Sequence, residues 1–339
     1  MTPKRRIIPV FVPHLGCPND CVFCNQRRIS GALTPATAKT VTDAITHARD
    51  TILHGNKAEL AFYGGSFTAI PAPWQEDLLG AAFPFLEDGT LDAIRLSTRP
   101  DCIDKETLGL LKKYGVTTIE LGVQSMQEDV LLKSGRGHTG EDTIQSAELI
   151  KKEGFTLILQ MMTGLPGDTK EKSLDTARKL IALNPDGVRI YPTVVLRDTR
   201  LYYLWKEGKY KEHTVLEAVD ICTELLELFE KENIPVIRFG LNPTEELSSG
   251  AAVGGAYHPA FGELVYGERY YKKERELLAP YQGAACVILG VPRGKISIAA
   301  GQKRKNILRL QKELSIGQIK IREQDGNNPD ITILAVEKA

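Results

Sequence analysis

Three features are missing from this chain of 339 residues. No apolar run approaches the roughly 20 residues that a membrane-spanning helix needs, and the N-terminal run Ile7–Val12 is short and interrupted by Pro9. Internal repeats and low-complexity segments are absent. The formal net charge is zero, so no dominant nucleic-acid-binding surface is indicated, although a local basic patch stays open. We expect a cytoplasmic protein that does not associate with membranes.

Cysteine is scarce and unevenly placed. Three of the six cysteines lie in one short Cys-x3-Cys-x2-Cys stretch, namely Cys17, Cys21 and Cys24. The other three, Cys102, Cys222 and Cys286, are isolated in the sequence. Structural zinc usually takes two separated pairs of ligands, and no second pair exists here. Three thiolates on a four-iron cubane would leave one iron open to a small molecule. A disulfide or a zinc knot is the alternative, but clustered cysteines fit a reducing compartment better than a secreted disulfide framework.

Strand-like apolar runs alternate with amphipathic helical stretches up to about residue 240. The predicted strands are 7–12, 59–63, 93–97, 117–121, 156–161 and 188–191, with a further short strand at 235–239. The predicted helices are 35–53, 73–85, 105–114, 141–153, 170–183 and 215–232. Strict alternation is typical of a parallel sheet with helical crossovers. We therefore expect an α/β fold, a partial (β/α)6 TIM-like barrel.

The last part of the chain has a different pattern. We expect helices at 268–278 and 302–314 and strands at 285–289, 295–299, 319–322 and 331–335. About eighty residues suffice for a small α+β domain with its own core. The predicted domains are therefore a core over 1–257 and a C-terminal α+β domain over 258–339.

Glycine-rich, polar or cysteine-containing segments follow each predicted strand of the core. They are Cys17–Cys24, Gly64–Thr68, Thr98–Asp101, Gly122–Ser125, Met162–Pro166 and Pro192–Thr193. Ligands of parallel α/β folds bind at the carboxyl ends of the strands. The sequence therefore predicts one site at this end of the sheet.

The cysteine spacing, with Phe23 just before the third cysteine, resembles the signature of the radical S-adenosylmethionine (SAM) superfamily. The segments GGSFTAIP, STRPD, ELGVQS, RGHT and YPTVVLRDTRLYYLWKEGKY follow in order, and together they resemble the radical SAM part of the Elongator complex protein 3 family over about residues 7–240. The resemblance implies a (β/α)6 core and a [4Fe-4S] cluster on Cys17, Cys21 and Cys24. An electron from the cluster would cleave SAM to a 5′-deoxyadenosyl radical that abstracts hydrogen from a substrate.

The same resemblance implies partners and one difference. It implies tRNA as the substrate, at the wobble uridine, and an electron donor such as a ferredoxin or flavodoxin. That family carries an acetyltransferase domain after the core, whereas we find no acetyl-CoA pyrophosphate loop in the tail of this chain. We therefore expect an Elongator complex protein 3-like radical SAM protein without that domain, and we do not carry over its acetyl-CoA-dependent reaction.

Five residues are candidates for the methionine end of SAM. The glycines Gly64 and Gly65 let a ligand approach the backbone closely, because no Cβ intervenes. In the superfamily a glycine-rich segment at this place receives the methionine ammonium. Ser66 and Phe67 complete the segment, and Phe23 lies in the cysteine loop. A tight strand-to-helix turn is the alternative interpretation of the glycines.

Polar residues after the third and fourth strands suit other parts of a ligand. Arg99 can bind a carboxylate or phosphate through its planar guanidinium, or it can pair locally with Asp101. Glu120 and Gln124 suit ribose hydroxyls, and a buried ion pair with an arginine is the alternative for Glu120. Ser97 is added to this set as a cofactor candidate.

The fifth and sixth strands supply the remaining candidates. Met162 and Leu165 can pack against an adenine ring, or they can fill the core. Aromatic and cationic residues are interleaved over 191–210, where they can stack RNA bases or pack the helix that closes the barrel. From this segment we keep Tyr191, which with Arg99 is a candidate catalytic residue.

Two other functions stay open. A radical SAM enzyme of this type can act on a small molecule or a protein instead of tRNA. A non-catalytic iron–sulfur protein that binds RNA or acts as a sensor is the alternative from a different class.

Overall fold

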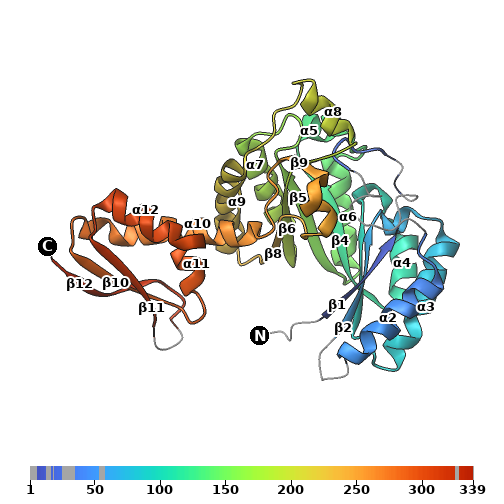
Figure 1. Ribbon diagram of the computed structural model, residues 1–339. Helices are drawn as coiled ribbons and strands as arrows, with labels where there is room; N and C mark the ends of the chain where they lie inside the picture. The colour runs from blue at the N-terminus through green and yellow to red at the C-terminus, as the bar shows by residue number, and fades with distance from the viewer. Residues whose placement is uncertain are drawn as a thin grey trace. The chain divides into compact units, whose positions relative to one another are not determined.

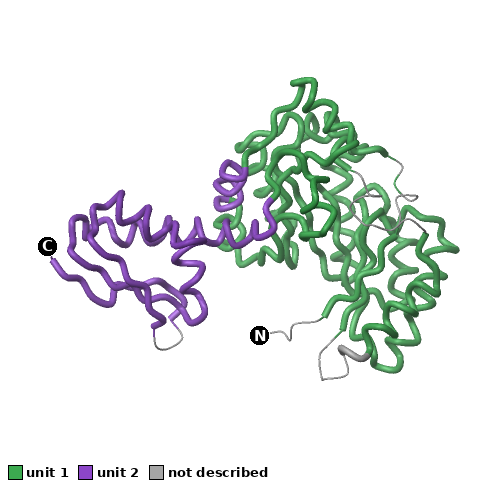
Figure 2. The backbone as a smooth tube through the Cα atoms, viewed as in Figure 1, with its two compact units in different colours: residues 1–214, 225–257 green, residues 215–224, 258–339 purple. Residues whose placement is uncertain are grey.

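The computed structural model describes residues 6–12, 17, 19–24, 35–52, 58–324 and 328–338, and it contains two compact units (Figure 2). Unit 1 comprises residues 1–214 and 225–257, and unit 2 comprises residues 215–224 and 258–339. Helix α9, Val215–Lys231, begins in unit 2 and ends in unit 1. That residues 1–257 and 258–339 are separate folding domains stays a prediction.

Seven parallel strands form the curved sheet of unit 1 in the order β1-β2-β3-β4-β5-β6-β8 (Figure 1). Their bounds are β1 Arg6–Val12, β2 Ala58–Gly64, β3 Ala93–Thr98, β4 Val116–Gln124, β5 Thr156–Thr163, β6 Gly187–Pro192 and β8 Val236–Phe239. Each strand of this sheet pairs in parallel with the next strand of the sheet along the chain, as helical crossover connections allow. The predicted partial (β/α)6 TIM-like barrel is confirmed, with β8 as the further short strand.

Helices connect these strands. Their bounds are α2 Ala38–Ile52, α3 Ala72–Glu87, α4 Lys105–Lys113, α5 Glu128–Lys133, α6 Gly140–Lys152, α7 Lys170–Ala182 and α8 Arg200–Lys206. Local caps fix several starts: the Asp104 side chain accepts from the Thr107 N–H at 2.7 Å, and Thr139 with Asp142 forms a capping box. The helix predicted over 35–53 begins at Ala38, and its last residue lies outside the described residues.

The two faces of the sheet differ in polarity. On one face Leu60, Phe62, Ile94 and Leu96 have no exposed surface, and the crossover helices pack over it. Side chains alternate between faces along a strand, so the residues between them point to the concave side. That side carries Glu59, Tyr63, Arg95, Glu120, Arg189 and Arg238, in or adjacent to one register across the strands. The interior of the half-barrel is therefore polar and suited to a polar ligand.

Two short strands and two short helices were not predicted. Strands β7 Val194–Leu196 and β9 Ala252–Gly255 pair antiparallel, and α5 and α8 are each shorter than eight residues. Segments of three to seven residues carry too little periodicity to be recognised. The α8 segment begins after Thr199, whose side chain accepts from the Tyr202 N–H at 3.1 Å. These elements surround the carboxyl ends of the core strands.

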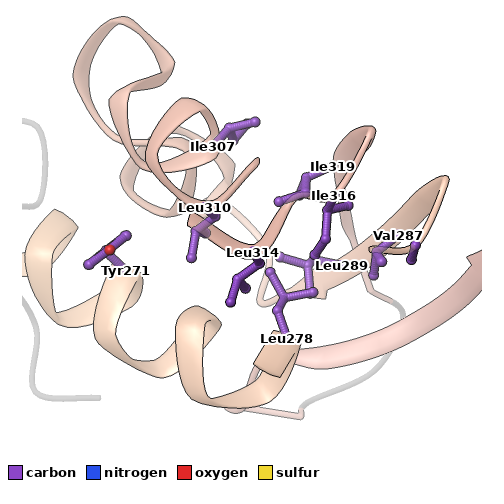
Figure 3. Close-up of a cluster of buried hydrophobic side chains, with 10 residues drawn as sticks. Tyr271, Leu278, Val287, Leu289, Ile307, Leu310, Leu314, Ile316 and Ile319 are labelled. Atoms are coloured by element: carbon purple, nitrogen blue, oxygen red, sulfur yellow. The ribbon is translucent and has the colours of Figure 1, made fainter. Parts of the chain in front are cut away.

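Unit 2 is a small α+β unit around one apolar cluster. Its elements include α10 Phe261–Leu278, β10 Cys286–Val291, α11 Ile296–Ala300, α12 Lys305–Leu314, β11 Gln318–Glu323 and β12 Thr332–Glu337. Central β10 pairs parallel with β11 and antiparallel with β12. Figure 3 shows side chains from α10, α12 and the sheet meeting in the cluster, among them Leu278, Leu289 and Leu310. None of the helices in the described part of the chain combines the length and apolar character needed to cross a bilayer.

One predicted strand of this unit is wrong. Residues 295–299 were expected to be extended, but Ile296–Ala300 is helical. The alternation Ile-Ser-Ile-Ala over four residues matches a strand, and periodicity over so short a run cannot separate strand from helix. Ala299 packs against Tyr270 and Val291, and this contact favours the helical turn.

A carboxyl group is buried in unit 2 without any partner. Glu274 of α10 has no exposed surface, and neither of its carboxylate oxygens has a hydrogen-bond partner in the described structure. Burial raises the pKa of Glu274 from 4.5 to about 8. The side chain is therefore a neutral acid in the folded protein at pH 7, whereas it ionises in the unfolded chain.

We predict that this group makes the protein less stable as pH rises. The folded-state pKa is raised, so the contribution is fully present below about pH 4.5 and is lost as pH rises towards 8, at about 1.4 kcal/mol of unfolding free energy per pH unit. Glu274→Gln keeps the shape and removes the ionisation, so its stability should depend less on pH across this window. Thermal and urea unfolding between pH 4.5 and 8 measures the difference, with exposed Glu276→Gln from the same helix as the control. Equal pH dependence of Glu274→Gln and the wild type would contradict the prediction.

Candidate functional site

The cysteine loop is fixed by hydrogen bonds from both sides. Cys21 is buried, and Cys17 and Cys24 are half-buried. Within the loop the Cys24 N–H donates to Cys21 O at 3.0 Å. The Val22 N–H donates to Ser134 O at 3.0 Å, and Val22 O accepts from the Leu201 N–H at 2.8 Å. The loop therefore lies between the segment that follows α5 and the start of α8.

Loops from three strands contribute groups beside the sulfur atoms. Cys17 Sγ lies 3.8 Å from Ser66 Oγ, which follows β2. Arg136 Nη1 donates to Cys21 Sγ at 3.6 Å, and its Nη2 donates to Gly122 O of β4. Arg99, which follows β3, donates through Nη2 to Arg136 O at 2.6 Å. The groups that follow β2, β3 and β4 therefore meet around the cysteine loop.

Several buried polar atoms at this end of the sheet lack a partner in the described structure. They are Arg99 Nη1, Gln124 Oε1, Arg136 Nε and Thr163 Oγ1. Such atoms are uncommon in folded proteins and frequent where water or a ligand binds. The donor set and these atoms fit a thiolate-bound cluster with a polar ligand beside it. Among the described residues no three His, Cys, Asp or Glu side chains are arranged as ligands of a single metal ion, so cluster ligation by the cysteines stays a prediction.

The carboxyl end of β4 is locally strained. The β4–β5 pairing shifts register between Gly122 and Gln124, and Gln124 has a positive φ of 66°. A non-glycine residue at positive φ costs free energy and is frequent at functional sites. Gly122 is required here, because a Cβ would lie 2.8 Å from Arg136 Nη2 and 2.9 Å from Gln124 Nε2. The close approach lets the Arg136 guanidinium reach the strand backbone.

A buried ion network crosses the concave face of the sheet. Glu120 accepts from Arg95 at 2.9 Å and from Arg189 at 2.9 Å, and Arg95 also binds Glu59 at 2.7 Å. Tyr63 OH donates to Glu120 at 3.2 Å. Burial and the nearby Glu120 carboxylate raise the pKa of Tyr63 to about 12, so it stays protonated at neutral pH. The network fixes Glu120 in the middle of the barrel.

Comparison with known families identifies the fold family. The model of the radical SAM superfamily matches residues 11–180, half of the chain, and the model of the radical SAM C-terminal domain matches residues 185–272. This chain belongs to the radical SAM superfamily.

Relatives with known names are found within the superfamily. Human Elongator complex protein 3 is 33% identical over 193 residues, which are 51% of this chain and 35% of that protein. The tRNA uridine(34) acetyltransferase of Methanocaldococcus jannaschii is 30% identical over 238 residues, 64% of this chain and 43% of that protein. The solved archaeal Elp3 of Methanocaldococcus infernus, lacking residues 1–46, is 25% identical with a TM-score of 0.60, over 80% of this chain and 63% of that one. The chain is therefore homologous to this family, and it spans less than half the length of these two curated relatives.

The residues predicted to bind the methionine end of SAM lie beside the cysteine loop, with one exception. Gly64 has a φ of 100°, which only glycine adopts readily, and the Gly65 N–H donates to Val12 O at 2.8 Å. Phe67 is different: its ring is fully buried, with its centroid 4.8 Å from that of Phe62 on the helix-covered face. The Phe67 side chain is thus part of the core, and only the backbone of this residue is available to SAM.

Two predicted polar ligands have protein partners. Arg99 binds Asp101 through Nε at 2.8 Å and Nη2 at 2.9 Å, and only 1% of its surface is exposed. Both Glu120 oxygens lie within 2.9 Å of arginine nitrogens. The structure therefore contains both alternatives that the sequence left open: the local pair of Arg99 with Asp101 and the buried ion pair of Glu120 with arginine. Oε1 already accepts from Arg95, Arg189 and Tyr63. Oε2 lies beside Arg189 Nε alone among the described residues, so a role of Glu120 towards ribose stays a prediction.

The other predicted contacts are distributed over the concave face and its rim. Ser97 pairs with Glu120 and Met162 pairs with Tyr191 in the sheet register. Burial raises the pKa of Tyr191, so its hydroxyl is protonated at neutral pH. Leu165 is buried in the loop after β5. Their contacts with cofactor or substrate stay predictions.

Phe23 packs beside the apolar cluster around Val22 and Leu201. This ring therefore helps to seat the cysteine loop on α8. A cofactor contact through the remaining half-exposed part of the ring stays a prediction.

From the sequence, His138 could be a proton carrier or a phosphate contact, a solvated loop histidine was favoured, and Arg136 had no role; the solvated position is wrong. His138 is 3% exposed, and its Nε2 lies 3.1 Å from Val123 O. Burial and the nearby Arg136 lower the pKa of His138 to about 4, so it is neutral at pH 7. Both residues lie in the segment RGHT, which was recognised as a motif. Its contact with the cysteine loop is long-range and could not be inferred from spacing.

We predict that Gly137→Ala reduces cluster loading. Gly137 has a φ of 79°, and a Cβ there would overlap the side-chain amide of Asn19 in the cysteine loop. The added methyl group must displace Asn19 and with it the loop. We expect several-fold less iron per chain after anaerobic reconstitution with iron and sulfide, measured by iron analysis and visible absorbance.

Gly154→Ala is the matched control. Gly154 has a similar φ of 84°, and a Cβ there would meet no atom within 4 Å. Both variants carry the backbone strain, and only Gly137→Ala carries the clash. The double variant Gly137→Ala/Asn19→Ala should recover iron. Equal iron loading of Gly137→Ala and Gly154→Ala would show that the contact does not position the loop.

Proposed function

We propose that this protein is a radical SAM enzyme that modifies tRNA, at the wobble uridine. In this proposal Cys17, Cys21 and Cys24 hold a [4Fe-4S] cluster and SAM binds beside it. The cluster would supply the electron that cleaves the sulfonium of SAM, and a 5′-deoxyadenosyl radical would then abstract hydrogen from the substrate.

One observation carries the proposal. The cysteine loop lies beside Ser66 after β2 and Arg136 after β4, at the carboxyl end of a parallel sheet. Superfamily membership by itself does not require these contacts, and they are what a thiolate cluster with an adjacent polar ligand needs. The unpartnered atoms of Gln124 and Thr163 support a ligand at the same place.

The substrate is inferred from the relatives. Two of them are named for Elongator and for acetylation of tRNA uridine 34. We infer tRNA as the substrate class of this chain, with a ferredoxin or flavodoxin as its electron donor. The matched region corresponds to part of those proteins, so the group that is transferred is not carried over with the substrate.

The residues of this chain have separate tasks in the proposed reaction. The Gly64–Gly65 backbone receives the methionine end of SAM, because no Cβ blocks the approach. Arg136 donates to Cys21 Sγ, and such donors to cluster sulfurs adjust the reduction potential. Arg99 holds Arg136 in place through the Arg136 carbonyl. Tyr191, with a protonated hydroxyl on the concave face, is the proposed group that contacts the substrate.

The proposal predicts SAM cleavage that depends on Cys21. The protein is reconstituted anaerobically, SAM and dithionite are added, and 5′-deoxyadenosine is quantified with and without bulk tRNA. We expect cleavage that rises with tRNA. Cys21→Ala should lose the cluster and all cleavage. Cys286→Ala, which replaces a lone cysteine of unit 2, is the control and should retain both.

The outcomes separate the alternatives. Cleavage that is indifferent to tRNA would keep the radical chemistry and reject the RNA substrate. No cleavage from a protein with a full cluster would favour the iron–sulfur binding or sensing function. Turnover retained in Cys21→Ala would falsify the assignment of the cluster ligands.

A further inference from the structure

A cavity of about 430 Å³ lies beside the loop that follows β5 in unit 1. The loop Gly164–Asp168 forms one wall, and Lys133, Lys209, Lys211 and His213 line the cavity from α5 and from the segment after α8. None of these four side chains has a task in the proposed SAM reaction. The volume falls within the range of about 300–1,000 Å³ that is typical of small-ligand sites.

The loop wall is held in a defined shape. The Gly164 N–H donates to Asp168 Oδ2 at 2.8 Å, and Ser173 Oγ donates to the same oxygen at 2.7 Å. Tyr210 OH donates to Gly164 O at 2.6 Å. Gly164 and Gly167 both have positive φ, at 75° and 81°. The cavity is therefore preformed on its loop side, which lowers the entropy that a ligand loses on binding.

The lining of the cavity has an excess of cations. Lys133 lies 3.3 Å from Asp129, but the same Asp129 oxygen lies 2.7 Å from Lys172. The pair Lys209–Glu207 is solvent-exposed, so it is weak. Lys211 makes no ion pair among the residues that the structure describes. Three lysines thus face one carboxylate, on a chain whose formal net charge is zero.

Asp168 and His213 also line the cavity. Oδ2 of Asp168 is occupied by the two hydrogen bonds of the loop, and burial raises the pKa of Asp168. His213 packs against Gly164, where its Nδ1 would lie 2.7 Å from an added Cβ. This Nδ1 is buried and lacks a partner in the described structure.

We propose that this cavity binds a phosphate group of the RNA backbone. Lysine is a usual phosphate ligand, acting as a point charge. The tRNA substrate proposed above favours a polynucleotide over an acidic peptide as the ligand of these lysines. The inference rests on the proposed RNA substrate and names where one phosphate of it binds.

The test is tRNA binding by the full chain, measured by fluorescence anisotropy with labelled bulk tRNA at several salt concentrations. The cavity variant is Lys133→Gln/Lys209→Gln/Lys211→Gln. We expect its Kd to rise about tenfold or more at 0.1 M salt, and the magnitude of the slope of log K against log salt to fall by about one, because the lost phosphate contact removes one counterion-release contribution. Circular dichroism and the thermal midpoint check that the cavity variant is folded.

A charge-matched control removes three exposed lysines elsewhere in unit 1, as Lys105→Gln/Lys113→Gln/Lys152→Gln on α4 and α6. This control should bind tRNA like the wild type. Equal weakening of both triple variants would overturn the inference, because binding would then follow total charge and not the cavity. Unchanged binding by the cavity variant would also overturn it, while the proposed RNA substrate would stand.

Further arms identify the source of the anion. If the wild type fails to bind tRNA, the proposed function itself fails. Inorganic phosphate, AMP and poly-glutamate are tested as competitors and as direct ligands. Tight binding of phosphate or AMP, abolished in the cavity variant, without tRNA binding would assign the cavity to a small phosphate ligand. Poly-glutamate binding without tRNA binding would assign it to an acidic peptide, and either result overturns the RNA assignment.

Discussion

Arg136 connects the elements on which the site depends. Its guanidinium donates to Cys21 Sγ and to the Gly122 carbonyl, while its backbone carbonyl accepts from Arg99. One residue thereby ties the cysteine loop after β1 to the ends of β3 and β4. Because charge-assisted hydrogen bonds are about twice as strong as neutral ones, this junction resists displacement. The small Gly122 suits this junction, since a Cβ there would crowd the guanidinium.

The ion network below this junction has a different physical character. Glu59, Arg95, Glu120 and Arg189 are nearly buried, and desolvation of such charges offsets much of their attraction. Apolar residues of similar volume would give at least equal stability. The network therefore contributes position more than stability. It keeps the concave face of the sheet polar, with Tyr63 protonated, whereas the opposite face under the helices is apolar.

The fold was largely predictable because its signals are local. Strand and helix periods, helix caps and glycine punctuation are written within ten to twenty residues, and the parallel topology follows from their alternation. The failures lie where the signal is shorter, as in Ile296–Ala300 and β7. The candidate site was predictable in its location, at the strand ends, but not in its contacts. Phe67 was placed with the cofactor because the sequence cannot show to which face its ring turns, and Arg136 was missed because its bond to Cys21 spans 115 residues.

The loop after β5 places two kinds of chemistry on one short segment. Met162 and Leu165 were assigned to the adenine of SAM, while Gly164 and Gly167 form the wall of the cationic cavity. Hydrogen bonds from Asp168 and Tyr210 fix this loop at Gly164. An anion held in the cavity would therefore contact the loop that we propose to border SAM. Such a coupling would let substrate binding influence SAM cleavage without a direct contact between the two ligands.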